Sequence, residues 1–202
     1  MKPQAIQTLL SCGLALAVAS SVTAQQPAGA QLAKTQSNSA APNFTAVTTQ
    51  SFGMDVVDGE LRAGGPRYKA LLDQSGIEFT PALGAAAVVN YPVHFRVTSI
   101  RRGETVAYNH LTAPRVAPQQ KGMVASYARG NGIVETYEAR VDGMKQNFTF
   151  AGKPAGAGDL VVEGRLTTTL AASQLGANDG GLMLQVPGIG GVQFGAVVGI
   201  DA

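Results

Sequence analysis

Glu135, Glu138 and Asp142 place three carboxylates in one short stretch, and a pair of carboxylates is the machinery of glycoside hydrolysis. The stretch IVETYEARVDGMKQNFTF, residues 133–150, alternates apolar and polar side chains as a β-hairpin does. Residues 135 and 138 are an odd number of positions apart, so a strand projects them to opposite faces. Asp142 precedes Gly143 in a dipeptide typical of a tight turn. This spacing argues against a catalytic pair.

Glu135 shares its predicted face with Ile133 and Tyr137, which makes it an acid on an apolar surface. An unpaired carboxylate there is costly, so it must accept hydrogen bonds, become protonated, or lie at a rim that water reaches. Catalysis and a ligand-facing rim are the alternatives to a structural role. We expect the structural role, with hydrogen bonds from neighbouring strand or turn groups. The candidate donors are Arg129, Gln146 and Asn147.

The remaining polar motifs do not predict a reaction centre. His94 and His110 fall in separate predicted strands without HxH or HExxH spacing, and no GxSxG motif precedes a helix. The glycine clusters at 152–158 and 188–191 lack the strand-to-helix context of a phosphate loop. Arg101 and Arg102 are expected at a solvated corner. The sequence therefore predicts a protein that is not an enzyme, with no catalytic, cofactor-binding or metal-binding residues and no cofactor.

Side chains after residue 54 follow a period of two. The alternation is clear over residues 93–98, 160–166, 182–186 and 192–200. Dipeptides suited to tight hairpin turns separate such runs, namely Asp58-Gly59, Asn131-Gly132, Asp142-Gly143 and Asp179-Gly180. We therefore predict an all-β domain over residues 54–202, an antiparallel β-sandwich or open barrel built from hairpins.

Residues 180–200 form an uncharged segment of 21 residues with GxxxG spacings at Gly191, Gly195 and Gly199. A membrane helix is one interpretation of such a segment. Seven glycines and the central Pro187 oppose it, and both halves alternate around the turn PGIGG. We expect a hairpin here and no stable membrane span.

The N-terminus reads as a secretory signal peptide over residues 1–24. Lys2 precedes the apolar run 9–19, and small residues ending at Ala24 suit a signal peptidase. A membrane anchor and a lipoprotein modified at Cys12 are the alternatives, but the run is short for an anchor and continues past Cys12. Because Cys12 is the only cysteine, the exported chain would have neither a disulfide nor a thiolate metal site.

Residues 25–53 are polar and of low complexity, which predicts a flexible leader. Removing Lys2 from 15 basic residues leaves 14 against 13 acidic ones, a net charge of +1. That balance predicts no polyanion partner such as nucleic acid. The absence of tryptophan also gives no aromatic surplus for stacking single strands.

Three stretches, residues 67–84, 90–104 and 132–166, resemble the β-rich N-terminal region of large secreted bacterial proteins with FG-GAP or related propeller-type repeats. The residues that match its motif are Glu135, Tyr137, Gly143, Gln146, Phe148 and Asp201-Ala202, and those that depart from it are Thr136, Ala139, Met144, Lys145 and Asn147. The resemblance implies the architecture and export, and it carries over no catalytic residue. Resembling proteins continue past this point, so it also implies either a fragment truncated at the C-terminus or a stand-alone version.

Two functions follow as expectations. The first is an exported, non-enzymatic structural or adhesion module of a cell-surface or extracellular repeat protein, secreted or held at the cell surface with an unknown protein or glycan partner. The second is a carbohydrate or surface-ligand binding domain that would use exposed aromatic residues, with Tyr91, Tyr108 and Tyr127 as candidates. A hydrolase is a distant third. An apolar last strand at a sheet edge also predicts self-association through residues 192–200.

Overall fold

The structure of the chain is a computed structural model that describes residues 8–10, 17–19, 52–174 and 181–201. Every helix or strand assigned within those ranges is a β-strand, and every pairing is antiparallel, which confirms the all-β prediction. The leader predicted over 25–53 lies outside the described residues except for its last two positions. Most of the predicted signal peptide, 1–24, lies outside them too.

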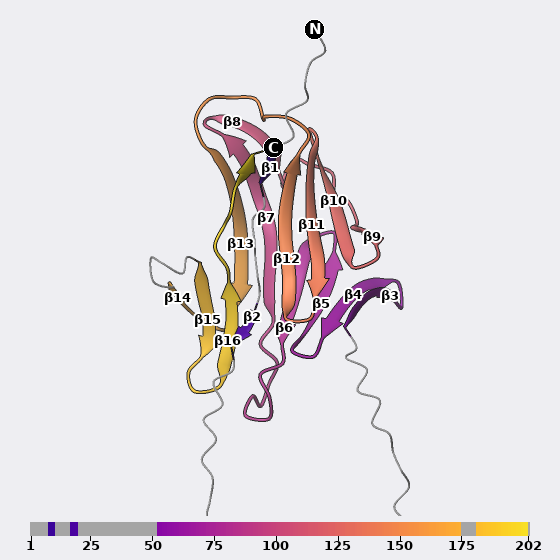
Figure 1. The fold of residues 1–202 in the computed structure, drawn as a ribbon, viewed down its shortest axis with the longest axis vertical. Coiled ribbons are helices and arrows are strands. Elements are labelled where there is room, and N and C mark those ends of the chain that lie inside the picture. Colours follow the sequence, from indigo (N-terminus) through magenta and orange to yellow (C-terminus); the bar gives the residue numbers. More distant parts are fainter. Residues whose placement is uncertain (1–7, 11–16, 20–51, 175–180, 202) are drawn as a thin grey trace, which may run out of the picture.

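The strands form three sheets (Figure 1). The seven-stranded sheet has the order β13-β7-β6-β5-β4-β3, with β8 paired to β7. Its strands are β3 (Gly53–Val57), β4 (Glu60–Gly65), β5 (Tyr68–Asp73), β6 (Gly76–Pro81), β7 (Val93–Arg102), β8 (Thr105–Asn109) and β13 (Leu160–Thr168).

The six-stranded sheet has the order β17-β1-β12-β11-β10-β9 and the four-stranded sheet the order β14-β15-β16-β2. The strands of the former are β1 (Thr8–Leu10), β9 (Gln119–Lys121), β10 (Val124–Gly130), β11 (Ile133–Arg140), β12 (Gly143–Phe150) and β17 (Ile200–Asp201). Those of the latter are β2 (Ala17–Ala19), β14 (Ala171–Gln174), β15 (Leu182–Val186) and β16 (Gly190–Phe194).

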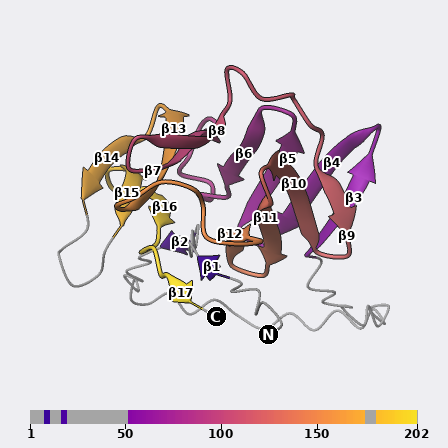
Figure 2. The same ribbon diagram turned by 90° about the horizontal axis from the view of Figure 1, so that it is seen from above.

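All three sheets contribute to one buried apolar cluster. Leu72 and Phe79 enter it from the seven-stranded sheet, Tyr137 from the six-stranded sheet, and Leu184 and Val192 from the four-stranded sheet. Seen from above, β10, β11 and β12 face β4, β5 and β6 across this core, with β15 and β16 at one side (Figure 2). None of the three strand orders closes on itself within the described ranges, so each sheet has two ends.

Two of the four predicted hairpin turns are confirmed as predicted. Asp58-Gly59 has φ values of 53° and 81°, and Asn131-Gly132 has 51° and 70°, the positive values that these dipeptides tolerate. At the third, Gly143 pairs with Arg140, so the turn residues are Val141 and Asp142 and Gly143 already belongs to β12. The fourth dipeptide, Asp179-Gly180, lies outside the described residues.

The uncharged C-terminal segment folds as the predicted hairpin. Leu182 pairs with Phe194 and Val186 with Gly190 across the turn at Pro187. The alternation does not continue as one strand to Ile200, because residues 195–199 have no strand structure and β17 joins a different sheet. No helix that is long and apolar enough to cross a bilayer occurs in the part of the chain that the structure describes.

Candidate functional site

Glu135 lies in the interior, at the centre of β11. In register it is opposite Tyr127 of β10 on one side and Phe148 of β12 on the other. The alternation predicted from the sequence is observed, because Ile133, Glu135, Tyr137 and Ala139 are all buried, and Glu135 itself has an exposed fraction of 0%. The acid is therefore part of the core rather than of a rim.

Both carboxylate oxygens of Glu135 accept hydrogen bonds. Arg129 donates to Oε2 from Nε at 2.7 Å and forms an ion pair from Nη2 at 2.6 Å. Gln146 donates to Oε1 from Nε2 at 2.6 Å. Two of the three candidate donors are therefore confirmed, while Asn147 lies opposite Thr136 in the register. A buried carboxylate with this many donors is satisfied without a ligand.

Arg129 connects this acid to aromatic side chains. Its guanidinium lies 4.4 Å from the ring centre of Tyr127 and 5.4 Å from that of Tyr108, and Nη1 donates to the Tyr108 hydroxyl at 3.3 Å. Burial lowers the pKa of Arg129, but the charge of Glu135 and its hydrogen bond outweigh burial and raise the pKa. The cation is thus held charged in a site where its side chain is only 7% exposed.

Tyrosine hydroxyls complete the network. Gln146 also donates to the Tyr137 hydroxyl at 3.0 Å, and the Tyr127 hydroxyl lies within hydrogen-bond distance of the carbonyls of Asp73 and Gly76 at 2.9 and 3.0 Å. No buried side-chain nitrogen or oxygen lacks a hydrogen-bond partner among the residues that the structure describes. The network joins strands β10, β11 and β12 to the β5–β6 turn. Its hydrogen bonds therefore hold the two sheets together.

Burial of the tyrosines predicts a loss of stability at high pH. Burial raises the pKa of Tyr68 from 10.0 to about 12, and it raises the pKa values of Tyr127 and Tyr137 as well. These hydroxyls stay protonated in the folded chain, so the stability they contribute is complete below pH 10 and is lost as the pH rises toward 12.

Spectrophotometric titration of tyrosinate, together with unfolding free energies across this range, checks the expectation. A folded chain whose tyrosines all ionise with ordinary pKa values would contradict it. The variant Tyr68→Phe is expected to show a shallower decline than the parent chain, because it removes one of the raised groups.

The other carboxylates do not join Glu135. Glu138 projects to the opposite face of β11, where it forms a half-exposed ion pair with Arg140 at 3.1 Å. Asp142 lies in the β11–β12 turn. The pairings that would suggest a glycosidase are therefore not formed.

The two histidines also make separate contacts and do not form a common site. Nδ1 of the exposed His94, on β7, lies 3.5 Å from Oε2 of Glu78, and Nδ1 of His110 lies 3.0 Å from the carbonyl of Thr98. His110 follows β8 rather than lying in a strand. Within the described ranges, no group of three or more histidine, cysteine or acidic residues is placed to hold a metal ion.

The three tyrosines proposed as a ligand platform do not form one. Tyr127 is 0% exposed and Tyr108 is 7% exposed, and Tyr91 packs partly buried against the core cluster. The expected solvent-facing surface of Tyr91, Tyr108 and Tyr127 is therefore wrong. Alternation in the sequence assigns residues to the two faces of a strand, but it does not determine which face points toward the interior. It therefore could not show that β8 and β10 turn their tyrosine rings inward.

Arg101 and Arg102 bond to neighbouring segments, whereas the sequence predicted a solvated corner. Arg101 lies 3.5 Å from Glu163 on β13, and Arg102 donates to the carbonyls of Pro154 and Gly158 at 3.2 Å each. These bonds attach the glycine-rich residues 151–159 to the end of β7.

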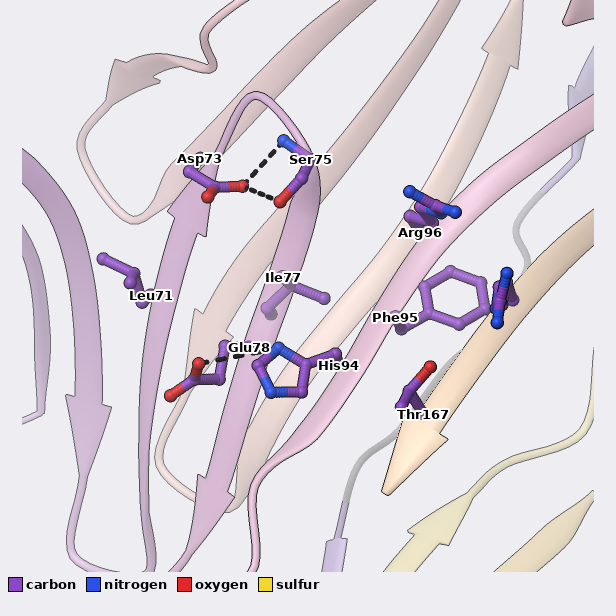
Figure 3. A pocket seen from close by; sticks show the side chains of 10 residues that line it. Leu71, Asp73, Ser75, Ile77, Glu78, His94, Phe95, Arg96 and Thr167 are labelled. Carbon is purple, nitrogen blue, oxygen red and sulfur yellow. Dashed lines mark hydrogen bonds and ion pairs between the residues drawn. The ribbon is translucent and has the colours of Figure 1, made fainter. Parts of the chain in front are cut away.

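Sequence reasoning missed a groove on the outer face of the seven-stranded sheet (Figure 3). The groove has a volume of about 540 Å³ and is lined from β5, β6, β7 and β13. Its polar side chains include Glu78, His94, Arg96, Arg165 and Thr167. No local signal marks it, because β7 and β13 are far apart in the sequence and each reads only as a strand with one polar face.

Comparison with protein-family models, with curated proteins and with solved structures found no match for this chain.

Proposed function

We propose that this chain is an exported, non-enzymatic β-sandwich module with a structural or adhesion role at the cell surface or outside the cell. The observation that carries the proposal is that Glu135 is buried and fully hydrogen-bonded. The acid that stood out in the sequence is fully buried, and both of its oxygens are used by Arg129 and Gln146. A carboxylate held in this way supports the fold, and neither of its oxygens is left to contact a substrate.

Two further features support the proposal. The N-terminal 24 residues have the order of a secretory signal, and the resemblance to the N-terminal region of secreted bacterial repeat proteins points to the same compartment. Sheets that share one core from opposite sides are what a β-sandwich requires.

A second role, as a carbohydrate or surface-ligand binding domain, is favoured by the groove on the outer sheet face rather than by the tyrosines. Polar side chains on an exposed sheet face, with Leu71 among them, offer both hydrogen bonds and apolar contact to a bound surface.

Export is tested by expressing the full chain in a bacterial host and determining where it accumulates and with which N-terminus. We expect a product outside the cytoplasm whose sequence begins at Gln25, because Ala24 ends the small-residue site. A chain that stays in the cytoplasm with residues 1–24 attached would contradict the proposal. The variant Ala24→Arg is the matched control, since it should block cleavage without altering the folded domain.

Cleavage has a structural consequence for the strands at the sheet edges. Residues 8–10 pair with both β12 and β17, and residues 17–19 pair with β16. Their removal leaves the backbone of Phe148–Phe150 and Gly191–Gln193 unpaired on one side. Unpaired strand edges bind other strands, so residues 25–202 should self-associate more than the uncleaved chain. Sedimentation of the two forms over a range of concentrations measures the difference, and a strictly monomeric mature form would count against it.

A further inference from the structure

The groove on the outer sheet face contains two arginines in direct opposition. Arg96 of β7 and Arg165 of β13 are paired in register, and both line the groove. Like charges directly opposite each other on neighbouring strands destabilise a sheet. The pair of arginines therefore needs an explanation that the fold alone does not supply.

Neither of these two cations is in direct contact with an acid in the described part of the chain. Neither Arg96 nor Arg165 forms an ion pair with a described residue. By contrast, Arg62 on β4 of the same sheet lies 2.6 Å from Glu60. The chain as a whole carries a formal net charge of only +2, so the unneutralised arginines do not follow from a generally basic composition.

The two acids that line the groove are engaged elsewhere (Figure 3). Oδ1 of Asp73 accepts hydrogen bonds from Ser75, at 2.7 Å from the backbone nitrogen and 2.5 Å from the hydroxyl. Oε2 of Glu78 lies 3.5 Å from Nδ1 of His94, an ion pair only when the imidazole is protonated. Figure 3 shows both contacts, with Arg96 apart from them on β7, the strand that also carries His94. Neither acid forms an ion pair with Arg96 or Arg165, so both guanidinium groups are left to contact a ligand in the groove.

A second hollow adds to this charge. Arg96 and Ser75 also line a smaller cavity of about 50 Å³, together with Arg115, Arg129 and His110. Arg129 is neutralised by Glu135, but Arg115 is exposed and has no ion pair with any residue that the structure describes. Arg96 and Arg115 thus both lie beside the β5–β6 turn, and neither forms an ion pair with a described residue.

We propose that this groove binds the carboxylate or sulfate groups of an acidic sugar chain through Arg96 and Arg165. A planar guanidinium donates two parallel hydrogen bonds to such an oxyanion, and an anion between the two arginines would remove their repulsion. The groove offers Leu71 beside the cations, which suits the apolar face of a sugar ring.

The size of the hollow also favours a chain of sugars over a single ion. Leu71 and Glu78 line both this groove and a neighbouring hollow of about 600 Å³ over β4 and β5. The two hollows are thus adjacent on one sheet face, and together they exceed the space that one oxyanion needs. This inference does not rest on export, because the groove is built from residues 71–167 alone.

The test is calorimetric titration of the full chain with polygalacturonate and with dextran sulfate. Neutral dextran, polyglutamate and inorganic sulfate serve as the comparison ligands. We expect both acidic sugars to bind, neutral dextran not to bind, and polyglutamate and inorganic sulfate to bind at least about tenfold more weakly. Polyglutamate or sulfate binding as tightly as the acidic sugars would overturn the sugar assignment, and no binding by either acidic sugar would overturn the site.

Single substitutions locate the binding. Arg96→Gln and Arg165→Gln are each expected to weaken acidic-sugar binding about tenfold, because each removes one set of charge-assisted hydrogen bonds. Arg140→Gln is the matched control, since it removes the same charge where Glu138 already neutralises it, and Arg140 lines neither hollow. Equal weakening in all three variants would mean that only net charge matters and would overturn the proposal. Unligated stability of the first two variants should equal or exceed that of the parent chain, which distinguishes lost binding from lost folding.

Discussion

Replacing Glu135 by alanine is expected to lower the free energy of unfolding by about 3–5 kcal/mol, the usual loss when one partner of a buried ion pair is removed. Arg129 would keep its charge in a site where its side chain is 7% exposed, with no carboxylate to accept its hydrogen bonds. Gln146 would lose one of its two acceptors as well. Urea unfolding followed by tyrosine fluorescence measures the change.

Glu138→Ala is the control for this experiment. It removes an acid from the same strand, but its ion pair with Arg140 is half-exposed, so the expected loss is about 1 kcal/mol or less. A double variant, Glu135→Leu with Arg129→Met, should recover part of the loss because no buried charge is left unpaired. Similar losses for Glu135→Ala and Glu138→Ala would show that the interior network does not stabilise the fold.

Gly76→Ala is expected to lower the free energy of unfolding by about 3 kcal/mol or more, because backbone strain and steric overlap act together. Gly76 opens β6 at a φ of 135°, and a Cβ there would lie 2.2 Å from the carbonyl oxygen of Phe95. The same glycine supplies one of the two carbonyls contacted by the hydroxyl of buried Tyr127. Moving this turn would therefore disturb the contact between the two sheets.

Gly84→Ala provides the comparison for Gly76→Ala. Gly84 also has a positive φ, 80°, but nothing lies within 4 Å of a Cβ built there. Only the backbone cost of about 1–2 kcal/mol is expected. Thermal or urea unfolding of both variants separates the two effects, and equal stabilities would show that the close approach to Phe95 is relieved at no cost.

The parts of the fold that the sequence predicted are those set by neighbouring residues. Alternation over residues 133–150 identified both strands of the β11–β12 hairpin and the buried face of Glu135. Arg129 and Gln146 were among three candidate donors named from the neighbouring strand and turn residues, and both donate to the acid. Asp58-Gly59 and Asn131-Gly132 were identified because a tight hairpin turn needs positive φ at both residues.

The parts that the sequence did not predict depend on pairing between distant strands. The opposition of Arg96 and Arg165 follows from the register of β7 and β13, which includes a bulge between Glu163 and Gly164. A shift of one residue would have put the other face of either strand in the groove. The burial of Tyr108 depends on its packing in a second core cluster with Ile100 and Phe148, which come from facing sheets.

Two arginines in different sheets show that the same residue type can have two different surroundings. Arg129 is enclosed with a carboxylate and two aromatic rings, so its charge stabilises the interior. Arg96 stands on the outer face without an ion-pair partner in the described ranges, so its charge is available to a ligand. Sequence alone gives both the same residue type at polar positions of a strand.

Glu135 is enclosed in the fold, where it supports the structure and is shielded from solvent. Hydrogen exchange of the arginine Nε–H groups, followed by nuclear magnetic resonance, tests this claim most directly. The account predicts that Nε–H of Arg129, bonded to Glu135 at 2.7 Å, exchanges far more slowly than Nε–H of Arg165 on the exposed sheet face. Exchange of the two groups at the same rate would show that water reaches Glu135 freely, and the account would then be wrong.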